Sequence, residues 1–519
     1  MIVLSAAQMQ AIDQETIKDV GIPGVVLMEN AGWAVAKVVA ERFSDKKRSG
    51  ALVLAGKGNN GGDGFVTARH LIALGWPVTT VVLAKRGDIK DDAAINMAVL
   101  EKCGGSITFI EDTLTSSLSK FSNPGVLVDS LFGTGLSKPL QGIYAEAVDW
   151  INHLHVPVVA VDMPSGIDAS NGQILGQAVR ATITVTFAFP KIGQITCPGA
   201  EYVGELATVD IGIPAIVSSR SEHYCWGVNG TQARQWLPHR PDGGHKGTFG
   251  HLVVLAGSIG KTGAAIMTAE SALRGGCGLV TLACPQSIYP IVASQLIEVM
   301  GKPLDDLHGE VSMLALDDIN KLLQSKDALA LGPGLGLGEE TGTLVRRLIQ
   351  DCPVPAVIDA DGLTHLTGHC EILKRRQGPP LVLTPHPGEM SRLTGMTIDE
   401  IQANRVDTAR EFASTYGVVL VLKGSRTITA CPSGKIYVNL SGHVGLASGG
   451  MGDVLTGLIG SFLAQGLEPA LASALATYIH GRAADNLRVE YGVSGLLATD
   501  IMQELPLARE ALHQGVFNA

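Results

Sequence analysis

The chain has 519 residues, of which 46% are hydrophobic and 17% charged, and this composition excludes a disordered protein because it supplies ample apolar side chains for cores. The formal net charge of −10, without a block of lysines or arginines, excludes nucleic-acid binding through a broad basic face. Eight cysteines without a CxxC pair argue against structural zinc and a disulfide framework, and they indicate buried thiols in a reducing cytoplasm.

The first part of the chain predicts alternating strands and helices. It lacks the basic and apolar regions of a signal peptide, and Ser5 with Gln8 predicts a capping box at the start of a helix. Further helices are expected over 28–43 and 65–74. Short apolar strands are expected at 51–55, 78–83, 126–129, 156–162, 182–187 and 206–210. This alternation predicts a mostly parallel, doubly wound sheet of the Rossmann-like kind.

A second series of strands and helices follows a break in the pattern. Around 212–230 the sequence turns to Pro, Ser, Asn and Gly, so we expect a boundary near Ser221 and two domains, 1–220 and 221–519. Helices are expected at 264–274, 341–351 and 405–416. The expected strands are 251–256, 279–284, 328–331, 356–359, 381–384, 418–423, 427–431 and 435–439. The chain is therefore expected to form two independent α/β domains.

The segment 56–64, GKGNNGGDG, predicts the first binding site. Its glycines let the backbone turn sharply and point N–H groups at an anion, and the following helix start adds partial positive charge. An ordinary nicotinamide-binding fold carries an acidic residue at the end of the second strand, where this chain has Ala84-Lys85-Arg86. An ordinary dehydrogenase is therefore disfavoured, and a tight turn with caps is the structural alternative.

Two later loops are expected to reach the same crevice, because loops at the carboxyl ends of parallel strands converge. They are 129–139, DSLFGTGLSKP, and 161–168, VDMPSGID. Asp162 is a candidate for acid/base catalysis, although it could simply cap the next turn. Asn60, Asp129 and Ser165 offer hard oxygen ligands suited to a metal cation.

These three motifs, in this order, resemble the NAD(P)HX epimerase family over residues 1–215. That family interconverts the R and S forms of hydrated NADH and NADPH. The resemblance implies a K⁺ ion held by Asn60, Asp129 and Ser165, with Asp162 at the reacting centre and Lys138 as a phosphate or acid/base partner. The implied dinucleotide contacts are Asn59, Asn60, Gly61, Gly62, Asp63, Gly133, Thr134, Gly135, Leu136, Ser137, Lys138, Pro139 and Asp162.

The segment SGGMGDVLTG, around 449–453, predicts a second site. Free N–H groups at a helix start can stabilise a transferring phosphoryl group, and Asp453 can take a proton from an attacking hydroxyl. The pattern resembles the GxGD anion hole of ribokinase-like kinases; a glycine-rich packing site is the alternative.

The stretch 444–467 is long enough to cross a bilayer, but Asp453 makes insertion costly, so no membrane contact is expected.

Four more loops accompany this site. KGSRT at 423–427 places a lysine and hydroxyls near phosphates, TPHPGEMSRL at 384–393 is held by two prolines, and LGPGLG at 331–336 allows close backbone approach. His386 alone would be read as a structural residue. AGSIGKTGAA at 256–265 resembles a P-loop, but Leu255 stands where the first glycine belongs, so substrate recognition is expected there.

Together with KGTFGHLVVLAGS, these motifs resemble the ADP/ATP-dependent NAD(P)HX dehydratase family over 225–510, with a ribokinase-like α/β fold. The resemblance implies Asp453 as catalytic base and Mg²⁺ with ADP at this site. The implied substrate and nucleotide contacts are Ala264, Gly334, Gly336, His386, Pro387, Gly388, Glu389, Met390, Ser391, Arg392, Lys423, Gly424, Ser425, Arg426, Thr427, His443, Val444, Gly445, Leu446, Ala447, Ser448, Gly449, Gly450, Met451, Gly452 and Asp453.

The sequence therefore predicts a cytoplasmic, homo-oligomeric enzyme that repairs hydrated NADH and NADPH. Its first domain epimerises the hydrates, and its second dehydrates the S form at the expense of ADP, giving AMP and phosphate. The small-molecule partners are NADHX, NADPHX and ADP or ATP. The alternatives are a ribokinase-like vitamin or sugar kinase that stops after phosphorylation, and a first domain that is a non-catalytic binding module.

Overall fold

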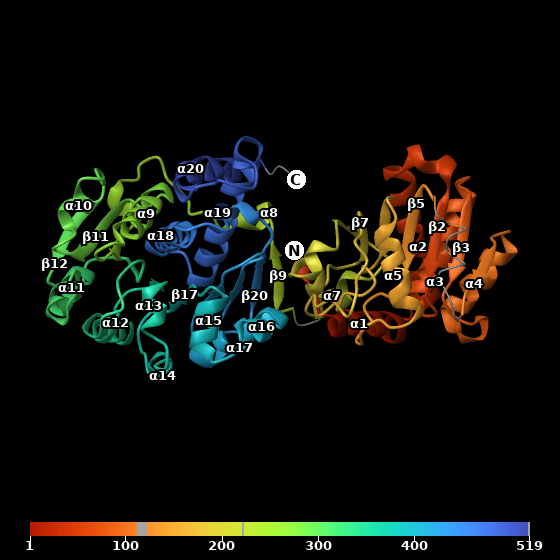
Figure 1. The fold of residues 1–519 in the computed structure, drawn as a ribbon, viewed down its shortest axis with the longest axis horizontal. Coiled ribbons are helices and arrows are strands. Elements are labelled where there is room, and N and C mark those ends of the chain that lie inside the picture. The colour runs from red at the N-terminus through yellow and green to blue at the C-terminus, as the bar shows by residue number, and fades with distance from the viewer. Residues whose placement is uncertain (112–120, 122, 221–222, 517–519) are drawn as a thin grey trace. The chain divides into compact units, whose positions relative to one another are not determined.

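The computed structural model describes residues 1–111, 121, 123–220 and 223–516. It divides the chain into two compact units: Ile2–Cys225, and Met1 with Trp226–Ala519 (Figure 1). Ser221, where the sequence places the domain boundary, lies outside the described residues. The division that the structure shows falls between Cys225 and Trp226.

The N-terminal unit is built on a sheet with the order β4-β3-β2-β5-β6-β7-β8. All of its described pairings are parallel, which confirms the expected sheet type. The order reverses between β2 and β5, and the carboxyl ends at such a reversal are the usual place for a ligand. The strands are β2 (Ala51–Ala55), β3 (Val78–Val82), β4 (Ile107–Phe109), β5 (Val126–Ser130), β6 (Val158–Val161), β7 (Ile183–Phe187) and β8 (Glu205–Val209).

Helices cover both faces of this sheet because alternate strand residues point to opposite sides. Val53 and Val128 pack under α2, α3 and α4, whereas Leu52 and Leu127 pack under α5. Ser5 and Gln8 form the expected capping box at α1. The helices are α1 (Ala6–Glu15), α2 (Gly24–Arg42), α3 (Asn59–Ala73), α4 (Asp91–Lys102), α5 (Ile143–His153), α6 (Ile192–Ile195) and α7 (Ala215–Arg220).

Helix α3 begins at Asn59, six residues earlier than the sequence predicts, so much of GKGNNGGDG is helical rather than loop. Its glycines allow close packing: a Cβ on Gly61 would overlap the carbonyl oxygen of Gly56, and one on Gly64 would overlap Ser130 Oγ. The segment therefore combines a helix start that is open to an anion with a helix that lies unusually close to the sheet.

The C-terminal unit is built on a mixed sheet with the order β9-β20-β19-β18-β17-β16-β15-β10-β11-β12. From β18 to β12 along this order the neighbouring strands pair in parallel, whereas β19 and β20 pair antiparallel. The strands are β9 (Cys225–Val228), β10 (His251–Leu255), β11 (Leu279–Pro285), β12 (Met300–Leu304), β15 (Ala328–Leu331), β16 (Ala356–Ile358), β17 (Leu381–Leu383), β18 (Val419–Leu422), β19 (Ile428–Ala430) and β20 (Ile436–Asn439). A small hairpin, β13 (Asp306–Leu307) with β14 (Glu310–Val311), lies apart from it.

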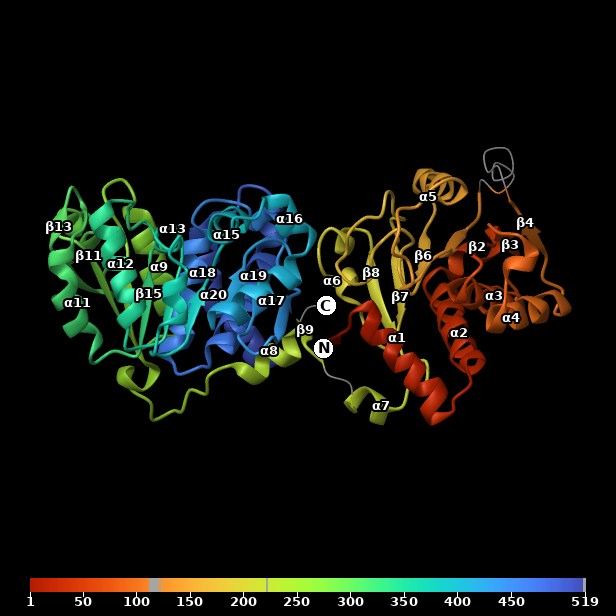
Figure 2. The same cartoon turned by 90° about the horizontal axis from the view of Figure 1, so that it is seen from below.

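Two helical layers enclose this sheet (Figure 2). One contains α9 (Thr262–Arg274), α18 (Met451–Ala464), α19 (Pro469–Tyr491) and α20 (Ala498–Gln514), whose apolar side chains pack on alternate strand residues such as Leu252. The remaining helices of the unit, without regard to layer, are α8 (Gly230–Trp236), α10 (Tyr289–Ala293), α11 (Leu316–Leu323), α12 (Glu339–Asp351), α13 (Asp361–Thr364), α14 (Glu371–Lys374), α15 (Pro387–Thr394), α16 (Ile398–Ala403) and α17 (Arg405–Tyr416). The expected α/β class is confirmed for both units.

The apolar stretch 444–467 owes its composition to burial inside the protein. Within α18, Leu458, Ile459 and Phe462 are fully buried in the helical layer. Among the residues that the structure describes, none of the helices combines the length and the apolar character that a bilayer crossing needs.

The packing of α3 predicts that alanine substitutions at two glycines differ in their effect on the free energy of unfolding. Gly61→Ala should lower the free energy of unfolding of the N-terminal unit by about 1–3 kcal/mol, because the added methyl group meets backbone atoms that cannot move aside. Chemical denaturation followed by circular dichroism measures this. Gly87→Ala is the matched control, because its Cβ would meet nothing within 4 Å; equal effects at the two positions would contradict the packing argument.

Candidate functional sites

The first candidate site lies where the loops after β2, β5 and β6 leave the sheet. A Cβ on Gly133 would stand 2.9 Å from Asn60 Oδ1 and 3.5 Å from Asp162 Oδ2. Three residues from three separate sequence motifs therefore meet at one point. Asn60 Nδ2 is buried and has no hydrogen-bond partner among the described residues, so its N–H groups are available for a ligand.

Asp129 and Ser165 form a buried pair beside this point. Ser165 N donates to Asp129 Oδ2 at 2.8 Å, and Ser165 Oγ donates to Oδ1 at 2.7 Å. Burial raises the pKa of Asp129 to about 6, although the hydrogen bonds from Ser165 oppose the shift. The pair links the loops after β5 and β6 and supplies two kinds of hard oxygen ligand.

Asp162 has a cationic partner that the sequence analysis missed. Lys191 Nζ lies 2.5 Å from Asp162 Oδ1, and the lysine is fully buried. Asp162 itself has φ 62°, a left-handed conformation that is uncommon outside glycine and that places its carboxyl group immediately after the strand. The signal in the sequence was a lysine at the end of the apolar run FAFPK, following β7.

Two further carboxyl groups face this ion pair. Burial, followed by the charge of Asp162, raises the pKa of Asp13 to about 6. Burial and the charges of Asp162 and Asp13 raise the pKa of Asp63 well above its ordinary value. Asp63 was expected in this site, whereas Asp13, on α1, was not. The site therefore gathers three acidic groups around one lysine.

The remaining residues expected to contact the dinucleotide occupy two segments. Asn59 is exposed at the start of α3, while Gly61 and Gly62 are buried within its first turns. The loop from Gly133 to Pro139 follows β5 and is exposed over most of its length. Lys138 is exposed on this loop, and among the described contacts it is not paired with Asp162. The proposed roles of these residues stay predictions.

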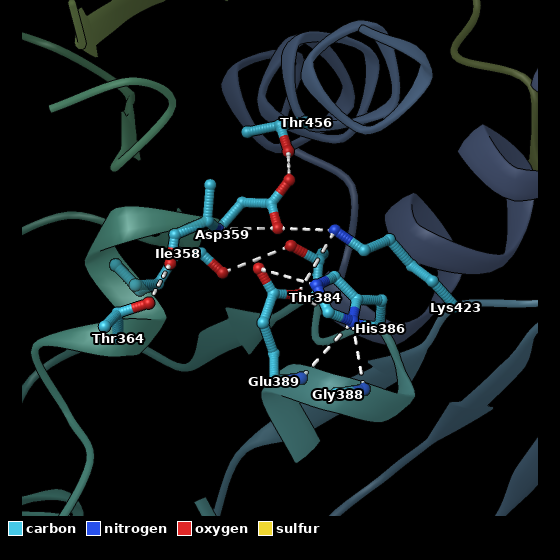
Figure 3. A network of polar contacts seen from close by, with 10 residues as sticks. Ile358, Asp359, Thr364, Thr384, His386, Gly388, Glu389, Lys423 and Thr456 are labelled. Atoms are coloured by element: carbon cyan, nitrogen blue, oxygen red, sulfur yellow. Dashed lines mark hydrogen bonds and ion pairs between the residues drawn. The ribbon is translucent and has the colours of Figure 1, made fainter. Parts of the chain in front are cut away.

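The second candidate site is organised by Asp359, which the sequence analysis did not single out (Figure 3). Asp359 follows β16 and is almost fully buried. Its Oδ1 lies 2.6 Å from Lys423 Nζ, and its Oδ2 accepts a hydrogen bond from Thr456 Oγ1 at 2.6 Å. Lys423 also lies 3.8 Å from Glu389 Oε2. This network connects the ends of β16 and β18 with α15 and α18.

The start of α18 lies against this network. Gly450, with φ 86°, turns the chain into the helix, and a Cβ on Gly452 would stand 3.4 Å from Lys423 Nζ and 3.6 Å from Asp359 Oδ2. Burial and the charge of Asp359 raise the pKa of Asp453 to about 7, despite the opposing charge of Lys423. The expected catalytic base thus occupies the first helical turn beside a lysine and further carboxylates.

His386 and Glu389 form a capping box at α15. His386 Nδ1 accepts from Gly388 N at 3.0 Å and Glu389 N at 3.3 Å, while Glu389 Oε2 accepts from His386 N at 2.7 Å. Partial burial and the charges of Lys423 and Arg392 lower the pKa of His386, and burial raises that of Glu389. His386 therefore has a structural role, and its half-exposed ring remains open for a ligand.

The loop LGPGLG meets the P-loop-like segment. A Cβ on Gly334 would stand 2.9 Å from the Cβ of Lys261 and 3.1 Å from that of Ala264. Lys261 Nζ pairs with Asp361 at 2.8 Å, and Asp361 also accepts from Gly336 N at 2.9 Å. Lys261, the lysine of GKT, is therefore engaged in an ion pair that stabilises the neighbouring loop.

The segment 443–448 is held next to α19. His443 Nδ1 accepts from Gly445 N at 3.0 Å, and its Nε2 lies 2.9 Å from the carbonyl oxygen of Ala484. In KGSRT, Arg426 donates to the carbonyl oxygen of Leu440 at 2.8 Å. The expected nucleotide-binding loops therefore have defined backbones, and their ligand contacts stay predictions.

Comparisons with known proteins identify the family. A family model described as NAD(P)H-hydrate dehydratase matches residues 252–507, and one described as YjeF-related protein N-terminus matches residues 24–193. A bifunctional NAD(P)H-hydrate repair enzyme from Moorella thermoacetica is 40% identical over 520 residues, covering 99% of this chain and 98% of that protein. This chain belongs to the bifunctional NAD(P)H-hydrate repair enzymes.

The family is matched along the whole chain. The repair enzyme from Thermofilum pendens is 39% identical and covers 99% of this chain and 97% of its own length. The solved ADP/ATP-dependent NAD(P)H-hydrate dehydratase from Bacillus subtilis, co-crystallised with ATP and Mg²⁺, is 32% identical; the match covers 55% of this chain and 97% of that chain, with a TM-score of 0.48. The family expected from the sequence motifs is confirmed, with an epimerase and a dehydratase domain in one enzyme.

The Asp359 network predicts a large loss of stability when its lysine is removed. Lys423→Met should lower the free energy of unfolding of the C-terminal unit by about 3–5 kcal/mol, because the buried carboxylate of Asp359 loses its cation. Urea denaturation measures the loss. Lys374→Met removes an exposed ion pair in the same unit and should change the free energy of unfolding far less, because solvent screens the two charges. Similar losses in both variants would contradict the assignment.

Proposed function

We propose that the C-terminal unit dehydrates the S form of hydrated NADH or NADPH at the expense of ADP, giving AMP and phosphate. The N-terminal unit interconverts the R and S forms and so supplies the usable one. The observation that carries this proposal is that each unit has an acid/base carboxyl group, at least partly buried, beside a largely buried lysine that follows a strand of the sheet. The full-length relatives, named for the same coenzyme repair, support it.

In the C-terminal unit, Asp453 takes the proton from the hydroxyl group on the hydrated nicotinamide ring. The hydroxyl oxygen attacks the terminal phosphorus of ADP, and AMP leaves. Free N–H groups at the start of α18 offset the charge that develops on the phosphoryl group. The ring nitrogen then expels phosphate, and loss of a proton from the adjacent carbon restores the dihydronicotinamide.

Metal ions would assist at both sites. Mg²⁺ bound with the nucleotide would neutralise phosphate charge, and Glu389 offers it a carboxylate at the first turn of α15. K⁺ would be held by Asn60, Asp129 and Ser165, whose oxygen donors suit a hard cation. The buried, unpartnered Nδ2 of Asn60 supports a ligand beside these residues. When bound, K⁺ would supply a fixed positive charge for an anionic part of the dinucleotide.

In the N-terminal unit, Asp162 exchanges a proton with the hydroxyl group of the ring, and the helix start at Asn59 and the loop 133–139 hold the dinucleotide. Exposed Lys138 would pair with a phosphate group of the substrate. We place the enzyme in the cytoplasm, where its eight free thiols stay reduced, and we propose that it forms a homo-oligomer.

The direct test is to incubate the full chain with mixed R and S hydrates and ADP, and to follow absorbance at the reduced-nicotinamide band. Both epimers should be converted completely, with release of AMP and phosphate. A stable phosphorylated product without recovered absorbance would instead establish the kinase alternative. Consumption of the S form alone would refute the epimerase role of the N-terminal unit.

The raised pKa of Asp453 predicts a pH dependence for dehydration. Because the base must be ionised, the rate with S hydrate and ADP should rise with pH through about 7 and then level off. Asp453→Asn should lower this rate by about 100-fold or more at every pH. Asp162→Asn is the matched control and should leave dehydration of the S form unchanged. Full activity in Asp453→Asn would refute the assignment of the base.

A further inference from the structure

The ammonium group of Lys191 has an acceptor for each of its N–H donors. Nζ contacts Asp162 Oδ1 at 2.5 Å, Thr186 Oγ1 at 2.8 Å and the carbonyl oxygen of Phe187 at 3.1 Å. An ammonium group has three N–H donors, so these acceptors occupy all of them. Since the side chain is also fully buried, Lys191 has no donor left for a substrate.

The two oxygens of Asp162 differ in their surroundings. Oδ1 accepts a hydrogen bond from Lys191 Nζ. It also accepts two longer hydrogen bonds, from Thr186 Oγ1 and Phe187 N, both at 3.3 Å. Oδ2 instead points to the place that Gly133 leaves open beside Asn60. Gln194 fixes the backbone of both partners: its Nε2 donates to the Asp162 carbonyl oxygen at 2.5 Å, and its Oε1 accepts from Lys191 N at 2.7 Å.

The buried Asp162–Lys191 pair and its strained backbone both lower the stability of the folded state. A buried ion pair recovers the lost hydration of its charges only with good geometry and additional hydrogen bonds. The left-handed backbone of Asp162 adds conformational strain. Strain and a buried charge concentrated on one residue are typical of a functional site.

We propose that Lys191 is the positioning residue of the N-terminal site: it holds Asp162 by Oδ1 and so directs Oδ2 at the substrate hydroxyl, whose proton Oδ2 exchanges. This inference rests on the proposed epimerase function. As the proton moves to Oδ2, the hydroxyl oxygen becomes a carbonyl oxygen and the ring carbon–nitrogen bond breaks. Its electron pair stays on nitrogen, conjugated with the carboxamide; after rotation of the aldehyde the bond re-forms on the other face, and Oδ2 returns the proton.

The neighbouring acids explain why a cation is needed there. Burial raises the pKa of Asp13 and of Asp63, and the charge of Asp162 adds to both shifts. Without Lys191, Asp162 would be a third carboxyl group in the same buried cluster with no positive charge beside it.

The test uses the full chain with Lys191→Ala, and separated R and S hydrates followed by chromatography. We expect kcat for R-to-S conversion to fall about 100-fold with little change in KM. Added propylammonium, which has the three carbons and the ammonium group that the variant lacks, should restore kcat by about tenfold or more. Dehydration of the S form by the same sample should be unchanged, which shows that the C-terminal unit is intact, whereas the rescue by the added amine shows that the N-terminal unit is folded. Lys37→Ala, an exposed lysine on α2, is the control.

A double variant separates positioning from a merely structural role. If Lys191 acts through Asp162, Lys191→Ala combined with Asp162→Asn should convert R to S no more slowly than Asp162→Asn alone. A double variant slower by about tenfold, or Lys191→Ala with the kcat of the wild type, would overturn the proposal. Failure of the wild type to interconvert R and S would instead refute the proposed function.

Discussion

A carboxylate buried at the end of a parallel strand needs a cation beside it, and each unit of this enzyme meets that need with a lysine from a later strand end. In the N-terminal unit the pair is Asp162 with Lys191, and in the C-terminal unit it is Asp359 with Lys423. Their oxygen–nitrogen distances, 2.5 and 2.6 Å, show that both pairs are in direct charge-assisted contact. Each pair also joins loops that the sequence keeps far apart.

The two pairs serve their sites in different ways. Asp162 has one oxygen engaged with Lys191 and one that lies toward Gly133 and Asn60, so the paired carboxylate is itself placed to react. Asp359 has both oxygens engaged, by Lys423 and Thr456, and instead raises the pKa of the nearby Asp453. In one unit the lysine holds the base itself in place. In the other, a fixed pair adjusts the base next to it.

Local patterns in the sequence were sufficient for the fold class and for much of the sites. The strand 51–55 matches β2, and motifs at successive strand ends do bring Asn60, Gly133 and Asp162 together, because parallel strands present their loops at one edge. The short strand β4 was missed because its three residues are only partly buried and lack an apolar run. The early start of α3 was missed because glycines argue against helix unless close packing on the sheet demands them.

Long-range pairing was beyond these patterns. Lys191 and Lys423 lie 29 and 64 residues from their carboxylates, and no local spacing relates the partners. The pKa of Asp453 depends in the same way on Asp359, which neither resemblance had singled out. The sequence offered a structural role for His386 as an alternative, but it did not indicate that this role is to cap α15.

The central claim, that two separate pockets in one chain recognise the same damaged coenzyme, is tested most directly by binding stoichiometry. Isothermal titration of the full chain with the S hydrate, without ADP, should show two molecules bound per chain. Saturation at one molecule per chain would contradict the account.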